Sequence, residues 1–167
     1  MYLLVMKIII SEAQHKRLFE EEQKVLHLPS AKVFGGWDEL QKFLELKGNP
    51  LYSLGGDLDL QLTTSVKSLG NLVSVDGDLV LDGSEIESLG NLTHVGGTFT
   101  MINTPIKTLG NLTSVGRSLF MNGSEIESFG NLTSVGINMF MRETPIDEKY
   151  SEEQIRQMIY VGNTIYS

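Results

Sequence analysis

The sequence predicts an α/β repeat protein: a parallel β-solenoid of about six short rungs, with an N-terminal strand-and-helix cap and a short C-terminal helix. A rung is one turn of the coil. Two observations lead to this fold. The tetrapeptide Leu-Gly-Asn-Leu, or Phe-Gly-Asn-Leu, recurs every 20 residues, and pairs of apolar residues recur at the same interval. A fixed period of roughly 20–50 residues is typical of repeat architectures.

The tetrapeptides begin at Leu69, Leu89, Leu109 and Phe129. Between them lie apolar residues two positions apart, in the pairs Leu79/Leu81, Phe99/Met101, Leu119/Met121 and Met139/Met141. This spacing is that of a short strand whose alternate side chains point inward. One rung cannot bury these side chains alone, so neighbouring rungs are expected to stack about 4.8 Å apart.

Two further rungs lie outside the tetrapeptides. Leu58 and Leu60 repeat the inward pair one residue out of phase, and Ile165 repeats it after a longer interval. The longer interval contains Ser151-Glu152-Glu153-Gln154, a capping-box pattern that predicts a helix near 151–160. Six strands are therefore expected, near residues 58, 79, 99, 119, 139 and 165.

Glycine and asparagine also form columns. We expect positive φ in the column that follows the apolar residue of each rung. This column contains Gly55, Gly96, Gly116, Gly136 and Gly162, with Asp76 as the exception. We expect the asparagines of the tetrapeptides to cap turns and to stack as a ladder; these are Asn71, Asn91, Asn111 and Asn131.

Residues 1–50 do not repeat and are predicted to form a capping segment, with the solenoid occupying residues 51–167. The apolar run at 2–10 predicts a buried strand, and it is too short to span a membrane. The capping box at Ser11 predicts a helix to about Leu26, and a second helix is expected from Trp37 to about Leu46. Open solenoids need such caps to cover their apolar ends.

The motif L-x-L-x-x-(N/T/S)-x-I-x-x-L resembles short leucine-rich repeats, and the segment from Leu92 to Met101 also resembles receptor L-domain repeats. Both families are right-handed parallel solenoids used for recognition, and the resemblance covers roughly residues 50–167. It departs where leucine-rich repeats commonly carry Asn, because this chain has Ser84, Thr104, Ser124 and Thr144 there.

The opening segment from Met6 to Gln14 is similar to the starts of small proteins of tailed phages. This resemblance implies a viral origin. It makes the host cytoplasm the expected location and a host or defence protein the expected target.

Charge and composition narrow the function classes. The chain has no Cys, which excludes disulfides and thiol catalysis and is compatible with a reducing, cytoplasmic compartment. The net charge is −8, and residues 51–167 carry the whole imbalance, with 14 acidic and six basic residues. A nucleic-acid surface needs the opposite sign, so a basic protein is the better partner.

The sequence contains few candidates for a catalytic or metal-binding site. His15, His27 and His94 are scattered without metal-ligand spacing, and His94 replaces the serine of other rungs, so it is expected to be exposed. The cluster formed by Asp57, Asp59, Asp78 and Asp82 stops after the second rung, unlike the regular Asp columns of calcium-binding repeats. We therefore expect no enzyme activity, no cofactor and no metal.

The outward face of the strands is the better candidate site. It is acidic at its N-terminal end and aromatic at its C-terminal end, where three rings are expected to stack in the open. Aromatic side chains are enriched at binding hot spots. The expected partner-binding residues are Asp57, Asp59, Asp78, Thr98, Thr100, Phe120, Asn138, Phe140, Arg142 and Tyr166.

Three functions remain open at this point. The first is a protein-interaction module that uses the strand face, the second a structural or virion accessory protein that self-assembles, and the third a carbohydrate binder that uses the aromatic side chains. The same aromatic ladder could also serve only to stabilise the sheet. The sequence leaves the oligomeric state open.

Overall fold

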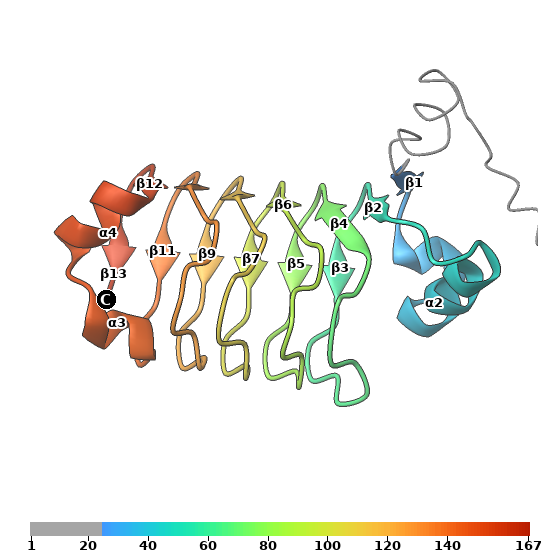
Figure 1. Cartoon of the computed structure of the whole chain (residues 1–167), viewed down its shortest axis with the longest axis horizontal. Helices are drawn as coiled ribbons and strands as arrows, with labels where there is room; N and C mark the ends of the chain where they lie inside the picture. The colour runs from blue at the N-terminus through green and yellow to red at the C-terminus, as the bar shows by residue number, and fades with distance from the viewer. Residues whose placement is uncertain (1–24) are drawn as a thin grey trace, which may run out of the picture.

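A computed structural model describes residues 25–167 and shows a parallel β-solenoid of stacked turns of about 20 residues (Figure 1). Two parallel sheets run along the stack. In the central rungs, paired strand residues lie 20 positions apart, as in Leu119 with Met139. The offset is 21 at the start, between Leu58 and Leu79, and 26 at the end, between Met139 and Ile165. These offsets confirm the phase read from the repeat.

The six-stranded sheet contains the six strands that the sequence predicts. In spatial order its neighbours are β13-β11-β9-β7-β5-β3. Its strands are β3 (Leu58–Asp59), β5 (Leu79–Val80), β7 (Phe99–Thr100), β9 (Leu119–Phe120), β11 (Met139–Phe140) and β13 (Ile165–Tyr166). The first residue of each strand is buried, so the predicted inward phase is confirmed.

A seven-stranded sheet lies on another side of the coil and was not predicted. Its order is β1-β2-β4-β6-β8-β10-β12. Its strands are β1 (Leu26–Leu28), β2 (Tyr52–Leu54), β4 (Leu72–Val75), β6 (His94–Val95), β8 (Ser114–Val115), β10 (Ser134–Val135) and β12 (Tyr160–Val161). The buried residues of a rung here are three apart, as in Leu92 and Val95, and therefore lack the alternation that indicates a strand.

The N-terminal elements partly match the prediction. The strand expected at 2–10 and nearly all of the helix expected from Ser11 lie outside the described residues. The end of that helix at Leu26 is wrong, because Leu26–Leu28 pairs with Tyr52–Leu54 as β1. A backbone beside an open sheet edge gains strand hydrogen bonds there. Helix α2 (Trp37–Leu46) is confirmed, and a short 3-10 helix, η1 (Ala31–Phe34), precedes it.

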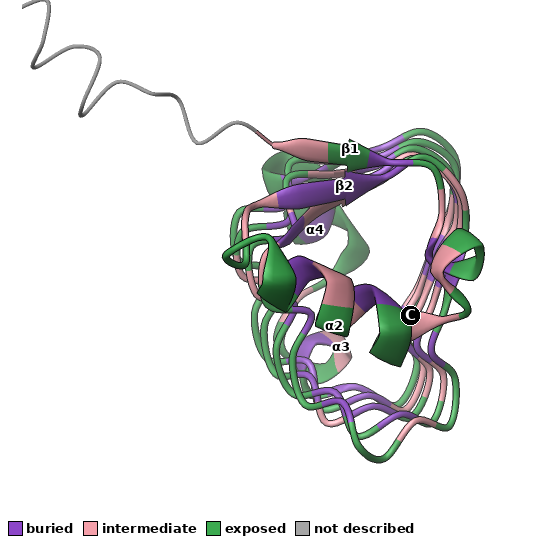
Figure 2. Ribbon diagram, turned by 90° about the vertical axis from the view of Figure 1, so that its right-hand side faces the viewer, coloured by how far each residue is buried: buried purple, intermediate pink, exposed green. Residues whose placement is uncertain are grey.

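Helix α2 lies across the N-terminal end of the stack (Figure 2). Its Leu40 and Leu44 are buried in the same apolar cluster as Tyr52 and Leu54 of the first rung. These contacts place the apolar face of the helix against the inside of the coil. Its charged residues remain exposed.

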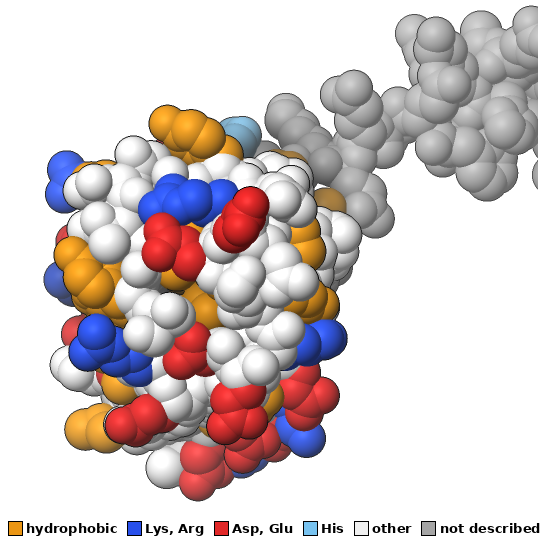
Figure 3. Space-filling view, turned by 90° about the vertical axis from the view of Figure 1, so that its left-hand side faces the viewer, with side chains coloured by type: hydrophobic (Ala, Val, Ile, Leu, Met, Phe, Trp, Pro, Cys, Tyr) orange, Lys and Arg blue, Asp and Glu red, His pale blue; other side chains and the backbone are white. Residues whose placement is uncertain are grey.

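Two short helices lie near the C-terminal end. Helix α4 (Glu152–Met158) begins at the predicted capping box, in which Ser151 and Gln154 each bond the other's backbone. Helix α3 (Pro145–Lys149), which was not predicted, begins at Thr144 with proline in its first turn. At this end, acidic side chains are interleaved with basic ones (Figure 3), and the exposed large apolar residues are Met158, Tyr160 and Tyr166.

A column of hydroxyl side chains is buried at one corner of the coil, where leucine-rich repeats commonly carry Asn. Thr104 donates to the carbonyl of Met101 at 2.9 Å, and Thr144 donates to that of Met141 at 2.6 Å. Each threonine hydroxyl bonds a backbone carbonyl three residues earlier in the same rung, whereas the buried hydroxyls of Ser84 and Ser124 have no hydrogen-bond partner among the described residues. These bonds give the two threonines a structural role.

The predicted positive φ at the glycines after the apolar column is wrong. Gly96, Gly116 and Gly136 do not adopt it, whereas the tetrapeptide glycines do, with Gly110 at φ +54°. The column is glycine for another reason. A Cβ on Gly116 would lie closer than 3.0 Å to the carbonyl oxygen of Gly96 in the preceding rung. The rungs therefore approach too closely for a side chain at Gly96, Gly116, Gly136 and Gly162, whereas Asp76 carries one in the same column.

Two alanine substitutions distinguish the cost of a steric clash between rungs from the cost of a strained positive φ. We expect Gly116→Ala to lower the free energy of unfolding by about 3 kcal/mol, because its methyl group meets neighbouring backbone that cannot yield. Gly110→Ala should cost only about 1 kcal/mol, because its positive φ is strained but the space beside it is open. Urea unfolding of both variants measures the difference, and equal costs would contradict the close-approach argument.

Candidate functional site

The candidate surface is the outward face of the six-stranded sheet, called here the strand face. It comprises the residues that flank each buried inward residue, from Asp57 in the first rung to Tyr166 in the last. Nine of the ten predicted binding residues belong to or directly flank one of the six strands of this face. The tenth, Arg142, lies two residues after the end of β11. The sheet brings into one row residues that lie more than 100 positions apart in the sequence.

The aromatic end of the strand face is an ordered stack. The rings of Phe120 and Phe140 have centroids 4.3 Å apart and planes at 5°. Those of Phe140 and Tyr166 are also 4.3 Å apart, with planes at 3°. The parallel register pairs Phe120 with Phe140 and Phe140 with Tyr166, so the rung spacing of about 4.8 Å sets the stacking. The predicted stack is confirmed.

The rings are less exposed than expected. Phe120 and Phe140 are half-buried, and Tyr166 is 37% exposed. Stacking covers ring faces that would otherwise meet water, which accounts for this difference. Phe140, the inner ring, has both faces covered, so mainly its edge remains accessible.

The acidic end has a structural role that the sequence did not reveal. Asp57 Oδ1 accepts the backbone N–H of Asp78 at 2.9 Å, and Asp78 Oδ1 accepts that of Thr98 at 2.7 Å. Asp59 Oδ1 accepts the N–H of Gln61 at 3.1 Å within its own rung. Each carboxylate therefore caps a backbone group at a strand end. Asp57 and Asp59 are nonetheless exposed and present their charge to solvent.

The remaining predicted residues follow the same pattern. Asn138 Oδ1 accepts the N–H of Thr164 at 3.1 Å, and Thr98 is half-buried beside Asp78. Thr100 donates its hydroxyl to Asp82. Arg142 is exposed, and its backbone N–H donates to the side chain of another rung. The face thus carries its acidic residues on the first two rungs and a basic residue on the fifth.

Three outward residues that are not among the predicted binding residues also accept backbone hydrogen bonds. Asp82 Oδ1 accepts the N–H of Ile102 at 2.8 Å, and Asn122 Oδ1 accepts that of Arg142 at 2.9 Å. Ser118 Oγ accepts the N–H of Asn138 at 3.4 Å. The signal that could have identified this capping role is the recurrence of short acceptor side chains on either side of the inward pair.

A second charged surface runs along another side of the coil. Lys67 pairs with Glu85, and this hydrogen bond raises the pKa of Lys67. Lys107 lies 3.9 Å from Glu125 and 4.0 Å from Glu127. All these side chains are more than half exposed, and exposed ion pairs contribute little to stability. The glutamate pairs of this strip recur after 40 residues, at Glu85/Glu87 and Glu125/Glu127.

The outer surface of the seven-stranded sheet is rich in hydroxyls. Thr93, Thr113 and Thr133 each donate to a carbonyl of the preceding rung, at 2.8–3.0 Å. His94 is exposed, as predicted, and its Nδ1 lies 2.6 Å from Ser114 Oγ. The threonines bond the backbone, so they stabilise the stack.

The tetrapeptide asparagines form part of the expected ladder. Asn91 Nδ2 donates to Asn71 Oδ1 at 3.1 Å, and Asn71 Nδ2 donates to the carbonyl of Asn49 at 2.7 Å. Asn111 Nδ2 instead donates to the carbonyl of Gly90 at 3.3 Å. The side chains link rungs through both amides and backbone.

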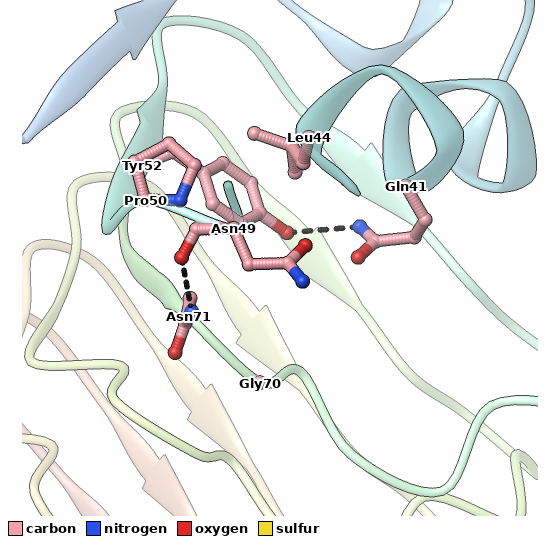
Figure 4. A pocket seen from close by; sticks show the side chains of 7 residues that line it. All are labelled: Gln41, Leu44, Asn49, Pro50, Tyr52, Gly70 and Asn71. Atoms are coloured by element: carbon pink, nitrogen blue, oxygen red, sulfur yellow. Dashed lines mark hydrogen bonds between the residues drawn. The ribbon is translucent and has the colours of Figure 1, made fainter. Parts of the chain in front are cut away.

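A small polar pocket lies between α2 and the first two rungs (Figure 4). Gln41 Nε2 donates to the hydroxyl of Tyr52 at 3.1 Å, and burial raises the pKa of Tyr52 to about 12 against the smaller opposing effect of that bond. The pocket volume is about 240 Å³, below the range of about 300–1,000 Å³ typical of ligand sites. Its polar groups join the cap to the solenoid.

Within residues 25–167, no group of three or more His, Asp or Glu side chains is arranged to hold a metal ion. No helix in that part of the chain has the length and apolar character needed to cross a membrane.

No protein-family model, curated protein or solved structure matches this chain.

Proposed function

We propose that this protein is a non-enzymatic protein-interaction module that binds a partner protein through its strand face. The observation that carries the proposal is the stack of Phe120, Phe140 and Tyr166 on the outside of the sheet. The interior is already filled by a separate set of buried side chains, among them Phe99, Leu119 and Met139, so these rings are not needed to form the core. The resemblance to leucine-rich repeats, which serve recognition, supports the same role.

The stack suits a protein contact because it is rigid. Phe140 is held between Phe120 and Tyr166, and each of those rings stacks on it, at a spacing set by the strands, so little side-chain entropy is lost on binding. Its exposed edges form an apolar strip that is flanked by polar residues, including Asn138 and Arg142. An apolar centre with a polar rim is the usual anatomy of a protein interface.

The acidic residues lie at one end of the strand face and therefore favour one orientation of a bound partner. Asp57, Asp59 and Asp78 lie on the first two rungs, three to five rungs from the rings of Phe140 and Tyr166. A partner with basic residues at one end and apolar residues at the other matches both features. The negative charge would act mainly by accelerating association, and the rings by slowing dissociation.

The carbohydrate alternative fits the stack poorly. Sugar rings pack flat against exposed aromatic faces, whereas the faces of Phe140 are covered by Phe120 and Tyr166. The tailed-phage resemblance of residues 6–14 makes a host protein, including a defence component, the first partner class to test. The structural alternative predicts self-association of the pure chain at micromolar concentration, which sedimentation would detect.

We expect the double variant Phe120→Ala/Phe140→Ala to weaken partner binding by more than about 2 kcal/mol, or about 30-fold in Kd. Neither side chain enters the core, so the fold should remain, with a loss of about 1 kcal/mol per ring pair at most. The partner is first captured from host lysate with the intact chain, and Kd is then measured by calorimetry.

Two control variants sharpen this experiment. Tyr160→Ala removes an aromatic side chain that is 68% exposed on the other sheet, and it should leave Kd unchanged. Replacing Asp57, Asp59 and Asp78 with Asn keeps an oxygen acceptor at each position but removes the charge, so association should slow and its salt dependence should flatten. If the aromatic double variant binds like the parent, the contact lies elsewhere, and the strip bearing Glu85, Glu87, Glu125 and Glu127 becomes the better candidate.

A further inference from the structure

An apolar groove lies at the N-terminal end of the molecule, between β1 and α2, away from the strand face. Its volume is about 470 Å³, and it is lined by Val25, Leu26, His27, Phe43, Lys47 and Pro50. Leu26 and Phe43 are only partly buried and pack on the edge of the core cluster. The described chain therefore leaves an apolar surface beside the outermost strand of the seven-stranded sheet.

The backbone of β1 is oriented to receive another strand. The N–H of Leu26 donates to Leu51 and the carbonyl of Leu28 accepts from Gly55, both at 2.8 Å and both toward β2. Backbone groups alternate in direction along a strand, so the N–H and carbonyl of His27 face away from β2. Within residues 25–167, β1 is the last strand on this side of the sheet. An open edge of this kind is a template for strand pairing.

We propose that residues 3–10 of this same chain occupy the groove and add a strand parallel to β1. The chain enters the groove at Val25, directly after residues 1–24. Residues 11–24 provide 14 residues between the added strand and β1. A parallel crossover needs a dozen or more, usually as a helix, and the capping box at Ser11 begins such a helix in the sequence.

The sequence of residues 3–10 also indicates which side of the added strand faces the groove. Side chains alternate along a strand, so Lys7 and Ile9 share one face while Met6 and Ile8 share the other. The charged Lys7 belongs on the solvent face, so Met6 and Ile8 face Leu26 and Phe43. The added strand would then cover the groove, pair with the open edge of β1 and bury apolar side chains of residues 3–10.

Disulfide trapping tests this placement, and the absence of native Cys makes the trap clean. Ile8→Cys is combined with Lys47→Cys in one variant and with Pro50→Cys in another, since both partners line the groove. The control combines Ile8→Cys with Met158→Cys at the opposite end of the stack. Under mild oxidation we expect an intramolecular disulfide with at least one groove position and none in the control. Cross-linked dimers would instead assign the groove to a second copy and overturn the proposal.

Amide exchange provides an independent measurement in the full-length chain. We expect the His27 amide to be protected in the parent and in Ile9→Asp, and to exchange at least tenfold faster in Ile8→Asp. The two variants differ only in which face receives the charge. A His27 amide that exchanges rapidly in the parent, together with no trapped disulfide, would refute the added strand. If both Asp variants behave alike, the assignment of the inward face is wrong.

Discussion

We expect Leu119→Asp to prevent folding at ordinary temperature. Leu119 is fully buried in a central rung, between Phe99 and Met139 of the neighbouring strands. An Asp there would bury a charge with no partner among apolar side chains, at a cost of several kcal/mol. The lost leucine burial adds about 2 kcal/mol. Together these losses approach the 5–15 kcal/mol total stability of a typical domain. Circular dichroism and a thermal melt measure the outcome.

The matched control is Thr98→Asp, which introduces the same charge on the outward side of the neighbouring rung. Asp78 and Asp57 occupy the equivalent outward position in the two preceding rungs, so this site accommodates a carboxylate. The control should therefore melt within a few degrees of the parent. A soluble Leu119→Asp with an unchanged Tm would show that the inward and outward phases had been reversed.

Removal of residues 1–50 should convert the protein into aggregates or oligomers. The truncation deletes β1 and α2, and with them the Leu40 and Leu44 side chains that lie against the first rung. Tyr52 and Leu54, now 1% and 0% exposed, would face water at the end of the stack. Exposure of each large apolar side chain costs about 1.5–3 kcal/mol, and open strand edges promote association. Light scattering on the purified fragment measures the effect.

A point variant separates loss of the cap from loss of chain length. Leu44→Asp keeps all 167 residues but places a charge on the buried side of α2, and it should reproduce part of the aggregation. Glu45→Asp, on the exposed side, should have no effect. A truncated fragment that stays monomeric and folded would show that residues 1–50 are a separate module and not a lid.

Much of the fold follows from the sequence because the repeat imposes one physical condition on every rung. The pairs Phe99/Met101 and Leu119/Met121 can be buried only by neighbours in the same register, so period and alternation together identify six strands and their inward sides. The outward stack of Phe120, Phe140 and Tyr166 follows from the same register. Local signals also sufficed for α2 and α4, which have apolar spacing or a capping box.

Other features depended on contacts between rungs that no local pattern reports. The second sheet was missed because its central rungs bury residues three apart, without the alternation that indicates a strand. Gly116 is required by the carbonyl of Gly96, which is 20 positions away in sequence but adjacent in space.

The acidic residues of the strand face show the same difference between what the sequence determines and what the tertiary structure decides. The sequence determined that Asp57 and Asp78 lie outward at one end of the strand face, because the register of the inward leucines leaves no other position for them. Only the tertiary structure decided that each carboxylate also accepts a backbone N–H from the next rung. The repeat period is a property of the chain, whereas these hydrogen bonds depend on the separation and tilt of stacked backbones, which are set only when the rungs pack together.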